Sequence, residues 1–191
     1  MRKERVGFAL CGSFCTHSAV LSVLEKMTEQ YETVVPIVSD YAAFTDTRFG
    51  TSEDFLEQLE DLTGNEILYD IKSVEPIGPQ KLLDVLVIAP ATGNTIAKLA
   101  AGISDTAVTM AAKAHLRNGR PVVVAVASND GLSAGAKNIG ELLNRKNYYF
   151  VPFGQDNAQQ KPSSLIADFN RIPETVEAAL KGEQIQPILL K

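Results

Sequence analysis

The sequence has few of the residues that build metal centres and disulfide frameworks. Its 191 residues include only two cysteines and two histidines. Cys11 and Cys15 lie four positions apart, and no further cysteine or close pair of histidines accompanies them, so we expect neither a metal site nor a disulfide. Both thiols are predicted to be reduced and buried, with Cys15 acting as a small apolar residue rather than as a reactive thiol.

Long apolar runs and basic stretches are also lacking. The longest apolar runs, residues 85–91 and 121–127, are far shorter than the roughly 18 residues that span a bilayer. Residues 1–5 lead directly into a predicted strand rather than into a signal peptide. The net charge of -5 reflects 23 acidic and 18 basic residues, with no basic stripe that could follow the phosphates of a nucleic acid. We therefore expect a cytoplasmic protein that binds neither membranes nor nucleic acids.

The common nucleotide and hydrolase motifs are absent as well. Gly7 and Gly12 are not followed by the third glycine of a GxGxxG fingerprint, and no GxxxxGK[ST] phosphate loop occurs. Ser13 lacks the flanking glycines of a GxSxG elbow, and no histidine and aspartate are placed to complete a catalytic triad. Ordinary NAD or ATP binding and serine hydrolysis are therefore disfavoured, and Ser13 is better interpreted as a hydroxyl that hydrogen-bonds a ligand.

What the sequence does contain is an alternation of apolar strands and amphipathic helices. Strands are predicted at residues 6–11, 33–38, 67–71, 85–89, 121–127 and 148–151. Helices are predicted in most of the intervals, including one that ends at Gly64 and others at 95–101, 105–117 and 133–145. Parallel strands that are buried on both faces need helices on both sides of the sheet. With 45% hydrophobic residues, we predict a single Rossmann-like, three-layer α/β domain over residues 1–191, with a doubly wound, mostly parallel sheet.

Residues 152–164 break this alternation. The segment PFGQDNAQQKPSS is polar and rich in turn-forming residues. Connections of this length are uncommon and are often functional or mobile. We predict a loop here that acts as a lid.

Two turns have the chemistry of a ligand site. Residues 84–105 run from an apolar strand through a Pro-Ala-Thr-Gly-Asn-Thr turn into a helix, and residues 12–16 form a second turn after the first strand. Ligands of open parallel sheets bind beyond the carboxyl ends of the strands, where helix N-termini favour anionic groups. The turns at Gly12, Ser39, Pro90 and Ser128 are therefore predicted to face one crevice that holds a nucleotide-like ligand.

The residues of these turns resemble a known family. GSFCT at residues 12–16, residues 39–44, PATGNT at 90–95 followed by AK, and AAGISD ending at Asp105 are similar to motifs of the homo-oligomeric flavin-containing cysteine decarboxylase superfamily, whose members hold FMN between subunits. Within that superfamily, the segments ASNDGLS, AKNIGELLNRKNYYFVPFGQDNAQQKP and ADF resemble the small subunits of sporulation enzymes that form dipicolinate.

The resemblance implies a set of flavin contacts. Gly12 and Ser13 would lie at the phosphate or the isoalloxazine ring, and Asp105 near a subunit junction. The complete set that the resemblance implies is Gly12, Ser13, Phe14, Ser39, Phe44, Thr92, Asn94, Thr95 and Asp105. Asn94 and Thr95 also have a simpler interpretation, because both residue types commonly cap helices.

Two departures from the family bear on the chemistry. The decarboxylases carry a histidine shortly before the strand that leads into their PASANT motif, whereas residues 73–79 contain none. Their PxMN segment is replaced by residues 127–130, where Asn129 remains a candidate contact for a substrate carboxylate. The missing histidine disfavours peptidyl-cysteine decarboxylation, and the altered PxMN segment removes the methionine contact of the family. No catalytic residue is assigned.

The remaining candidates are cations and histidines. Lys137, Lys161 and Arg48 are candidates for holding substrate carboxylates. His17, in the first turn of a predicted helix, is interpreted as solvated or capping rather than catalytic. His115 is interpreted as structural.

The resemblance also implies a reaction and partners. A homo-oligomer of this chain, working with a larger subunit that resembles an NAD(P)-binding dehydrogenase, would oxidise a dihydro or hydroxytetrahydro ring precursor to the aromatic dicarboxylate in the mother cell of a spore former. One alternative is a cofactor-binding or scaffolding subunit without chemistry of its own. Another is a flavin-dependent decarboxylase or prenyltransferase.

Overall fold

The fold is built on one seven-stranded sheet. The computed structural model describes residues 1–190. Its strands are β1 (Arg2–Leu10), β2 (Tyr31–Val38), β3 (Val85–Ala91), β4 (Val122–Ser128), β5 (Tyr148–Phe150), β6 (Phe153–Asn157) and β7 (Lys161–Ala167). Their order is β2-β1-β3-β4-β7-β6, and β5 also pairs with β4. Strands β1 to β5 are parallel to their partners, whereas β7 pairs antiparallel with both β4 and β6.

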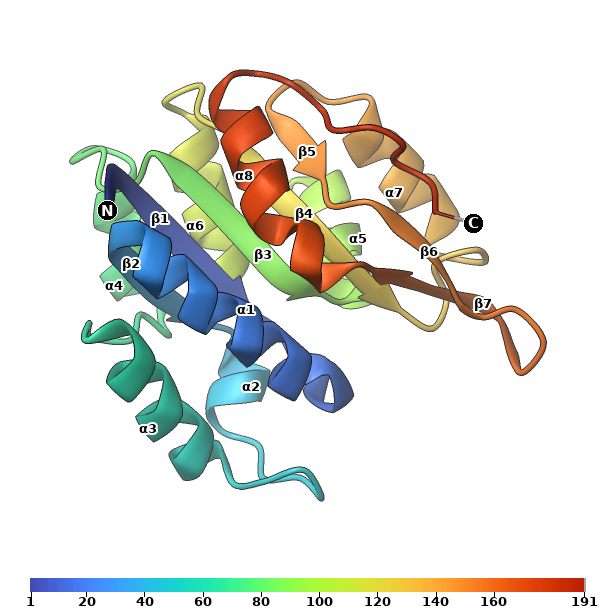
Figure 1. Cartoon of the computed structure of the whole chain (residues 1–191), viewed down its shortest axis with the longest axis horizontal. Coiled ribbons are helices and arrows are strands. Elements are labelled where there is room, and N and C mark those ends of the chain that lie inside the picture. Colours follow the sequence, from blue (N-terminus) through green and yellow to red (C-terminus); the bar gives the residue numbers. More distant parts are fainter. Residues whose placement is uncertain (191) are drawn as a thin grey trace.

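Helices cover both faces of this sheet (Figure 1). One face carries α1 (His17–Gln30), α3 (Ser52–Thr63) and α8 (Ile172–Leu180), and the other carries α5 (Gly93–Ala101), α6 (Ala107–Leu116) and α7 (Ala136–Leu143). Short helices α2 (Asp40–Ala43) and α4 (Ile71–Val74) and the 3-10 turns η1 (Phe14–Thr16), η2 (Glu75–Ile77) and η3 (Phe169–Arg171) complete the chain. The prediction of a three-layer, doubly wound α/β fold is confirmed.

The two central strands, β3 and β4, correspond to the longest apolar runs of the sequence. Every residue of β3 and of β4 is buried, because helices pack on both faces of these strands. Fully burying an aliphatic side chain contributes about 1.5–3 kcal/mol. The runs VLVIAPA and VVVAVAS therefore fix the middle of the sheet.

Within residues 1–190, no helix is both long and apolar enough to cross a membrane.

Local capping fixes where helices begin and end. The Thr51 side chain accepts a hydrogen bond from the Asp54 N–H at the start of α3, which ends at Gly64 with φ of 62°. Thr92 caps α5 in the same way through the Thr95 N–H. The predicted end of a helix at Gly64 is confirmed.

Some predicted elements differ from the structure. Residues 67–71 form no strand, and Leu68 makes only an isolated bridge to Ile37, because Asp70 begins a capping box that starts α4. The helix predicted from residue 133 begins at Ala136, after turns closed by hydrogen bonds to the Asp130 carbonyl.

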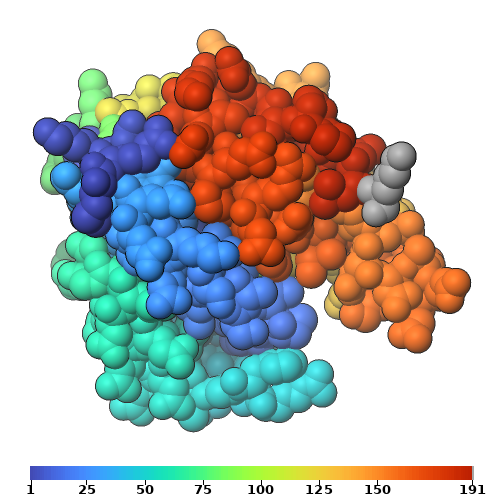
Figure 2. All heavy atoms as spheres, in the orientation of Figure 1, coloured from blue at the N-terminus to red at the C-terminus, as the bar shows by residue number. Residues whose placement is uncertain are grey.

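The predicted lid loop at residues 152–164 is instead an antiparallel hairpin formed by β6 and the start of β7. Its exposed tip extends away from the body of the molecule, shown in orange in Figures 1 and 2. Leu165 and Ala167 anchor its base in the core. The structure corrects the conformation of this segment, and its role as a lid stays a prediction.

Candidate functional site

A cavity opens at the carboxyl ends of β1, β2 and β3. Its volume is about 490 Å³, and loops from all three strands and the start of α6 line it. The lining residues are Cys11, Gly12, Ser39, Asp40, Tyr41, Thr92, Asn94, Thr95, Lys98 and Thr106. The loops after β1, β2 and β3 thus meet at one rim of the sheet, as the arrangement of parallel strands predicts. Pro90 and Ser128, which were predicted to face the same crevice, are not among its lining residues.

Gly12 lets the loop after β1 approach the start of α2. A Cβ atom at Gly12 would lie 2.5 Å from Cδ1 of Tyr41, well inside van der Waals contact. The Tyr41 ring is 63% exposed and lies 5.6 Å, between ring centroids, from Phe14. This wall of the cavity therefore contains the Tyr41 ring, which packs closely against the Gly12 backbone because Gly12 has no side chain.

The opposite wall is the first turn of α5, which is polar. The Thr92 and Thr95 hydroxyls lie 3.1 Å apart, and the Thr95 N–H donates to Thr92 Oγ1 at 3.3 Å. Asn94 is exposed, and its amide makes no hydrogen bond within residues 1–190. Thr92 is thus the cap, which leaves the Asn94 amide free to face a ligand.

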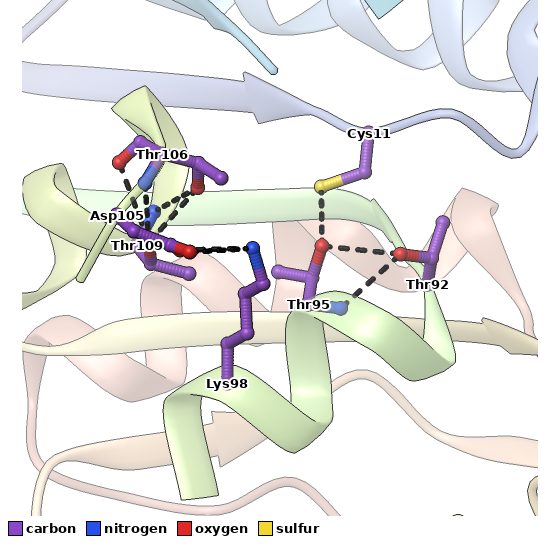
Figure 3. Close-up of polar contacts among 7 residues, drawn as sticks. All are labelled: Cys11, Thr92, Thr95, Lys98, Asp105, Thr106 and Thr109. Carbon is purple, nitrogen blue, oxygen red and sulfur yellow. Dashed lines mark hydrogen bonds and ion pairs between the residues drawn. The ribbon is translucent and has the colours of Figure 1, made fainter. Parts of the chain in front are cut away.

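Cys11, directly after β1, points its thiol toward this turn (Figure 3). The Thr95 hydroxyl donates to the Cys11 thiol, with 3.3 Å between Oγ1 and Sγ. Burial raises the pKa of the Cys11 thiol to about 11, and the hydrogen bond from Thr95 offsets only part of that rise. Cys11 therefore stays a neutral thiol near pH 7 and is not a nucleophile.

Lys98 brings a positive charge to the cavity. Its ammonium lies 2.8 and 3.0 Å from the two carboxylate oxygens of Asp105 (Figure 3). The hydrogen bond and charge of Lys98 lower the pKa of the Asp105 carboxyl. Asp105 itself lies outside the lining and holds Lys98 in place. Sequence reasoning missed Lys98, although its position four residues after Asn94 puts both side chains on one face of α5.

The predicted flavin contacts divide into two groups. Gly12, Ser39, Thr92, Asn94 and Thr95 line the cavity together. The others lie outside it. Phe14 lines a neighbouring cavity of about 300 Å³, Phe44 is exposed and packs edge-on against Tyr69, and Ser13 and Asp105 belong to neither lining.

The loop after β4 packs against the start of α5. The Ser128 hydroxyl donates to the Asp130 carboxylate. A Cβ atom at Gly93 would lie 2.6 Å from Asp130 Oδ1 and 2.7 Å from Ser128 Oγ. Glycine at this position of the PATGNT turn therefore permits a contact that alanine would obstruct, and a carboxylate lies beside the N-terminus of α5.

The histidines do not line the cavity. His17 is 7% exposed, its Nε2 lies 2.8 Å from the Cys11 carbonyl oxygen, and its ring stacks on Phe55 at 4.5 Å. Burial lowers the pKa of His17, so the neutral ring donates to that carbonyl and holds the loop after β1. The expectation of a solvated His17 was wrong, because Phe55 of α3 covers it.

His115 is also buried, and its Nε2 lies 3.0 Å from the Pro121 carbonyl oxygen. Burial lowers the pKa of His115 to about 4, which agrees with a structural role. Cys15 is exposed in η1 rather than buried, so that expectation was wrong. Its side chain contributes to the neighbouring cavity instead of the core.

The predicted substrate contacts lie apart from the main cavity. Asn129 and Lys161 line a cavity of about 320 Å³ along the first half of β7, where the Ser164 hydroxyl lies 3.5 Å from Asn129 Oδ1. Lys161 pairs with Asp156 at 2.7 Å. Lys137 is exposed on α7, and Arg48 lies over the ring of Phe49.

Comparison with known proteins identifies the family. A family model described as Flavoprotein matches residues 1–178. The B subunit of dipicolinate synthase from Bacillus subtilis (strain 168) is 43% identical over 191 residues, which cover 100% of this chain and 96% of that protein. The crystal structure of the B subunit of dipicolinate synthase from Bacillus halodurans C is 46% identical, with a TM-score of 0.90 over 98% of this chain and 96% of that one.

A more distant solved structure shares the fold alone. The FMN-dependent cysteine decarboxylase SpaF is 23% identical, with a TM-score of 0.69 over 93% of this chain and 95% of that one. The match to the family model, which covers most of the chain, and the two relatives matched along almost their whole length agree with each other. The chain belongs to the flavoprotein family.

Proposed function

We propose that this chain is the small subunit of a dipicolinate synthase. In that role it helps to oxidise a dihydrodipicolinate or hydroxytetrahydrodipicolinate precursor to dipicolinate during sporulation. The observation that carries the proposal is the 43% identity to the B subunit of dipicolinate synthase over the full length of the chain. The cavity at the sheet rim supplies a site where such chemistry can take place.

The residues of the cavity fit FMN. Its volume of about 490 Å³ lies in the range of cofactor sites. The Ser39 hydroxyl, the free Asn94 amide and the N-terminal turn of α5 are donors suited to phosphate and ribityl oxygens. The Thr92 and Thr95 hydroxyls, which already donate within the protein, can accept from ribityl hydroxyls. Tyr41 and the bare backbone at Gly12 make a flat wall on which a heterocycle can pack. Bound FMN would supply a two-electron acceptor.

Phe14, Ser13, Phe44 and Asp105 remain proposed flavin contacts, although they lie outside the lining of this cavity. They would reach the cofactor if it extends beyond the lining residues or if a second copy of the chain closes the site. Homo-oligomerisation is part of the proposal for that reason.

Lys98 and Cys11 define what the chain itself does in the cavity. The substrate is a ring dicarboxylate, so its binding requires charge neutralisation. Lys98 is the cation among the described lining residues, and Asp105 fixes the direction of its ammonium. Lys98 would orient an anionic group, while the neutral Cys11 thiol keeps the floor of the site unreactive.

The hairpin supplies the second proposed contact region. Asn129 and Lys161 line its cavity, and the hydrogen bond and charge of the Asp156 carboxylate raise the pKa of Lys161. We propose Asn129 and Lys161 as substrate contacts on a lid, with Lys137 on α7 as an outer contact.

The proposed partners follow from the reaction. The larger partner would be the A subunit of dipicolinate synthase, which would bind NAD(P) and receive the electrons. With that role, the chain would work in the mother-cell cytoplasm of a spore-forming bacterium.

The proposal is tested by purifying the chain and its partner separately. We expect flavin absorbance in this chain and dipicolinate formation only when both subunits are present. Dipicolinate production by the partner alone would contradict shared catalysis. A Lys98→Ala variant should lower product formation at limiting substrate concentration, whereas Lys26→Ala, an exposed lysine on α1, should leave it unchanged.

A scaffolding subunit is the main alternative, because no histidine lies among the described residues that line the cavity. Under that alternative, flavin-free protein would support full product formation by the partner. A flavin-dependent decarboxylase would instead release carbon dioxide without the partner. The same purified subunits therefore distinguish the three functions.

A further inference from the structure

A second cavity, of about 390 Å³, lies at the other end of α5. The crevice described above uses the first two turns of this helix, whereas the second cavity begins at Leu99 and Gly102, at its C-terminal end. A helix of nine residues is about 13 Å long. A small ligand in one cavity would therefore not overlap a ligand at the N-terminal end of α5.

Positive charge dominates the walls of this second cavity. Lys113 and Arg117 of α6 and Arg145 after α7 line it, and no carboxylate occurs among the described lining residues. This contrasts with a chain whose net charge is -5. Glu141 of α7 faces Arg145 at 3.0 Å from outside the lining, so the charge of Arg145 is partly neutralised.

The three cations differ in the hydrogen bonds that they make within the protein. Arg145 donates to the Leu99 and Ala100 carbonyls at 3.0 and 2.6 Å and thereby caps the end of α5. Lys113 contacts only the Ser104 hydroxyl, at 3.3 Å, and the Arg117 side chain has no hydrogen bond or ion pair within residues 1–190. Cations do stabilise helix C-termini. That effect accounts for their position on α6 but leaves their charged ends available to a ligand.

Apart from Ser104 and Thr109, the rest of the wall is mostly apolar. Tyr148, Leu116 and Ile103 line the cavity, and Ile103 is 47% exposed. Tyr148 is half-buried on β5, and burial raises its pKa, so its ring faces the cavity in neutral form. An aromatic and aliphatic wall with two free cations one helical turn apart suits a flat ring that carries two carboxylates.

We propose that this cavity is a second anion site that binds a planar ring dicarboxylate. The choice of dipicolinate as its occupant rests on the proposed function, because that reaction would release it. The apolar wall receives the ring, and Lys113 and Arg117 receive the carboxylates. The site would let the product bind without displacing the cofactor or substrate from the crevice.

The test is calorimetric titration of the full chain with dipicolinate in metal-free buffer. The variant Lys113→Ala, Arg117→Ala should weaken binding at this site about tenfold or more, a loss of about 1.4 kcal/mol or more, since it removes both cations that would receive the carboxylates. A matched control, Lys26→Ala, Lys181→Ala, removes the same charge from exposed positions on and beside α1 and α8, on the other face of the sheet, and should bind as the wild type does. The exchange Lys113→Arg, Arg117→Lys keeps both charges and should retain most of the affinity.

Lys98→Ala separates this site from the crevice, because it removes only the crevice cation. Binding should persist in that variant, and flavin affinity should be unchanged in the Lys113, Arg117 double variant. Binding of the dicarboxylate does not depend on turnover. Loss of product formation in the two-subunit assay would therefore contradict the proposed function without bearing on the second site.

Several results would overturn the second site. They are the absence of dipicolinate binding by the wild type, equal affinity in the double variant and the control, or equally strong competition by inorganic phosphate, which would show a site for any anion. A change in oligomeric state of the double variant with wild-type dicarboxylate affinity would assign these cations to an interface between copies and would also overturn it.

Discussion

The two loops that face each other across the crevice are stabilised in different ways. The loop after β1 is held by packing, because His17 stacks on Phe55 and reaches the Cys11 carbonyl, while Gly12 lies against Tyr41. The loop after β3 is held by polar side chains, through the Thr92 cap and the Lys98–Asp105 pair. One wall therefore depends on the buried core, and the other can exchange its hydrogen bonds with a ligand.

Replacing His17 should have the largest effect on this contrast. His17→Ala removes a buried ring and its hydrogen bond, and we expect a loss of about 2–3 kcal/mol in the free energy of unfolding, measured by urea denaturation. His17→Phe keeps the stacking on Phe55 and should recover part of the loss. The exposed neighbour Ser18 is the control, since Ser18→Ala should change stability by less than about 0.5 kcal/mol. Wild-type stability of His17→Ala would show that packing does not hold this loop.

Acid should affect the β1 loop before the β3 loop. The pKa of His17 in the folded chain lies below its ordinary value of 6.5, so the unfolded chain binds the proton first and stability falls as the pH drops below about 6.5. The pKa of Asp105 lies below 3.8, so its contribution is present above that pH and is lost only as the pH falls further. His17→Gln should flatten the upper part of the stability profile, after correction for buried His115, whose pKa of about 4 acts in the same direction. An unchanged profile would contradict the role assigned to His17.

Removing the cap of α5 should have a smaller effect. Thr92→Ala deletes the side-chain acceptor for the Thr95 N–H, which costs about 1 kcal/mol in the free energy of unfolding. Thr92→Ser retains the hydroxyl and should remain close to the wild type. If both variants are equally destabilised, the lost methyl group rather than the cap accounts for the change.

Asn94 should give the smallest change in stability. Because its amide has no hydrogen bond within the described chain, Asn94→Ala should alter the free energy of unfolding by less than about 0.5 kcal/mol. Flavin affinity, measured by fluorescence titration, should weaken about fivefold, since one net hydrogen bond is worth about 1 kcal/mol. Unchanged flavin affinity would remove Asn94 from the proposed cofactor contacts.

Sequence reasoning worked best where one physical effect dominates. The apolar runs of β3 and β4 predict central strands because both faces are covered. Gly64 predicts a helix end because glycine readily adopts the positive φ that the structure shows there. The meeting of the loops at Gly12 and Thr92 follows from parallel topology. These features depend on local sequence together with one general rule about sheets.

Prediction from the sequence was less successful where contacts between residues far apart in the chain determine the structure. Phe55 buries His17, and the turn after α5 returns Asp105 to Lys98; neither contact has a local signature. The polar composition of residues 152–164 concealed a hairpin, because the exposed edge of a sheet tolerates polar side chains on both faces. Cys15 was predicted to be buried because a cysteine beside a strand usually is, whereas the turn of η1 directs it outward.

The strand β4 pairs with different strands along its length, and this pairing determines where insertions can be tolerated. Residues 122–124 pair with β5, whereas Ala127 and Ser128 pair with β7. The last residues of the central strand are therefore hydrogen-bonded to the base of the hairpin. Amides near Leu165 should exchange slowly with deuterium, and those at the tip rapidly. Insertions at the tip could therefore alter which molecules reach the rim while the central strand keeps its register.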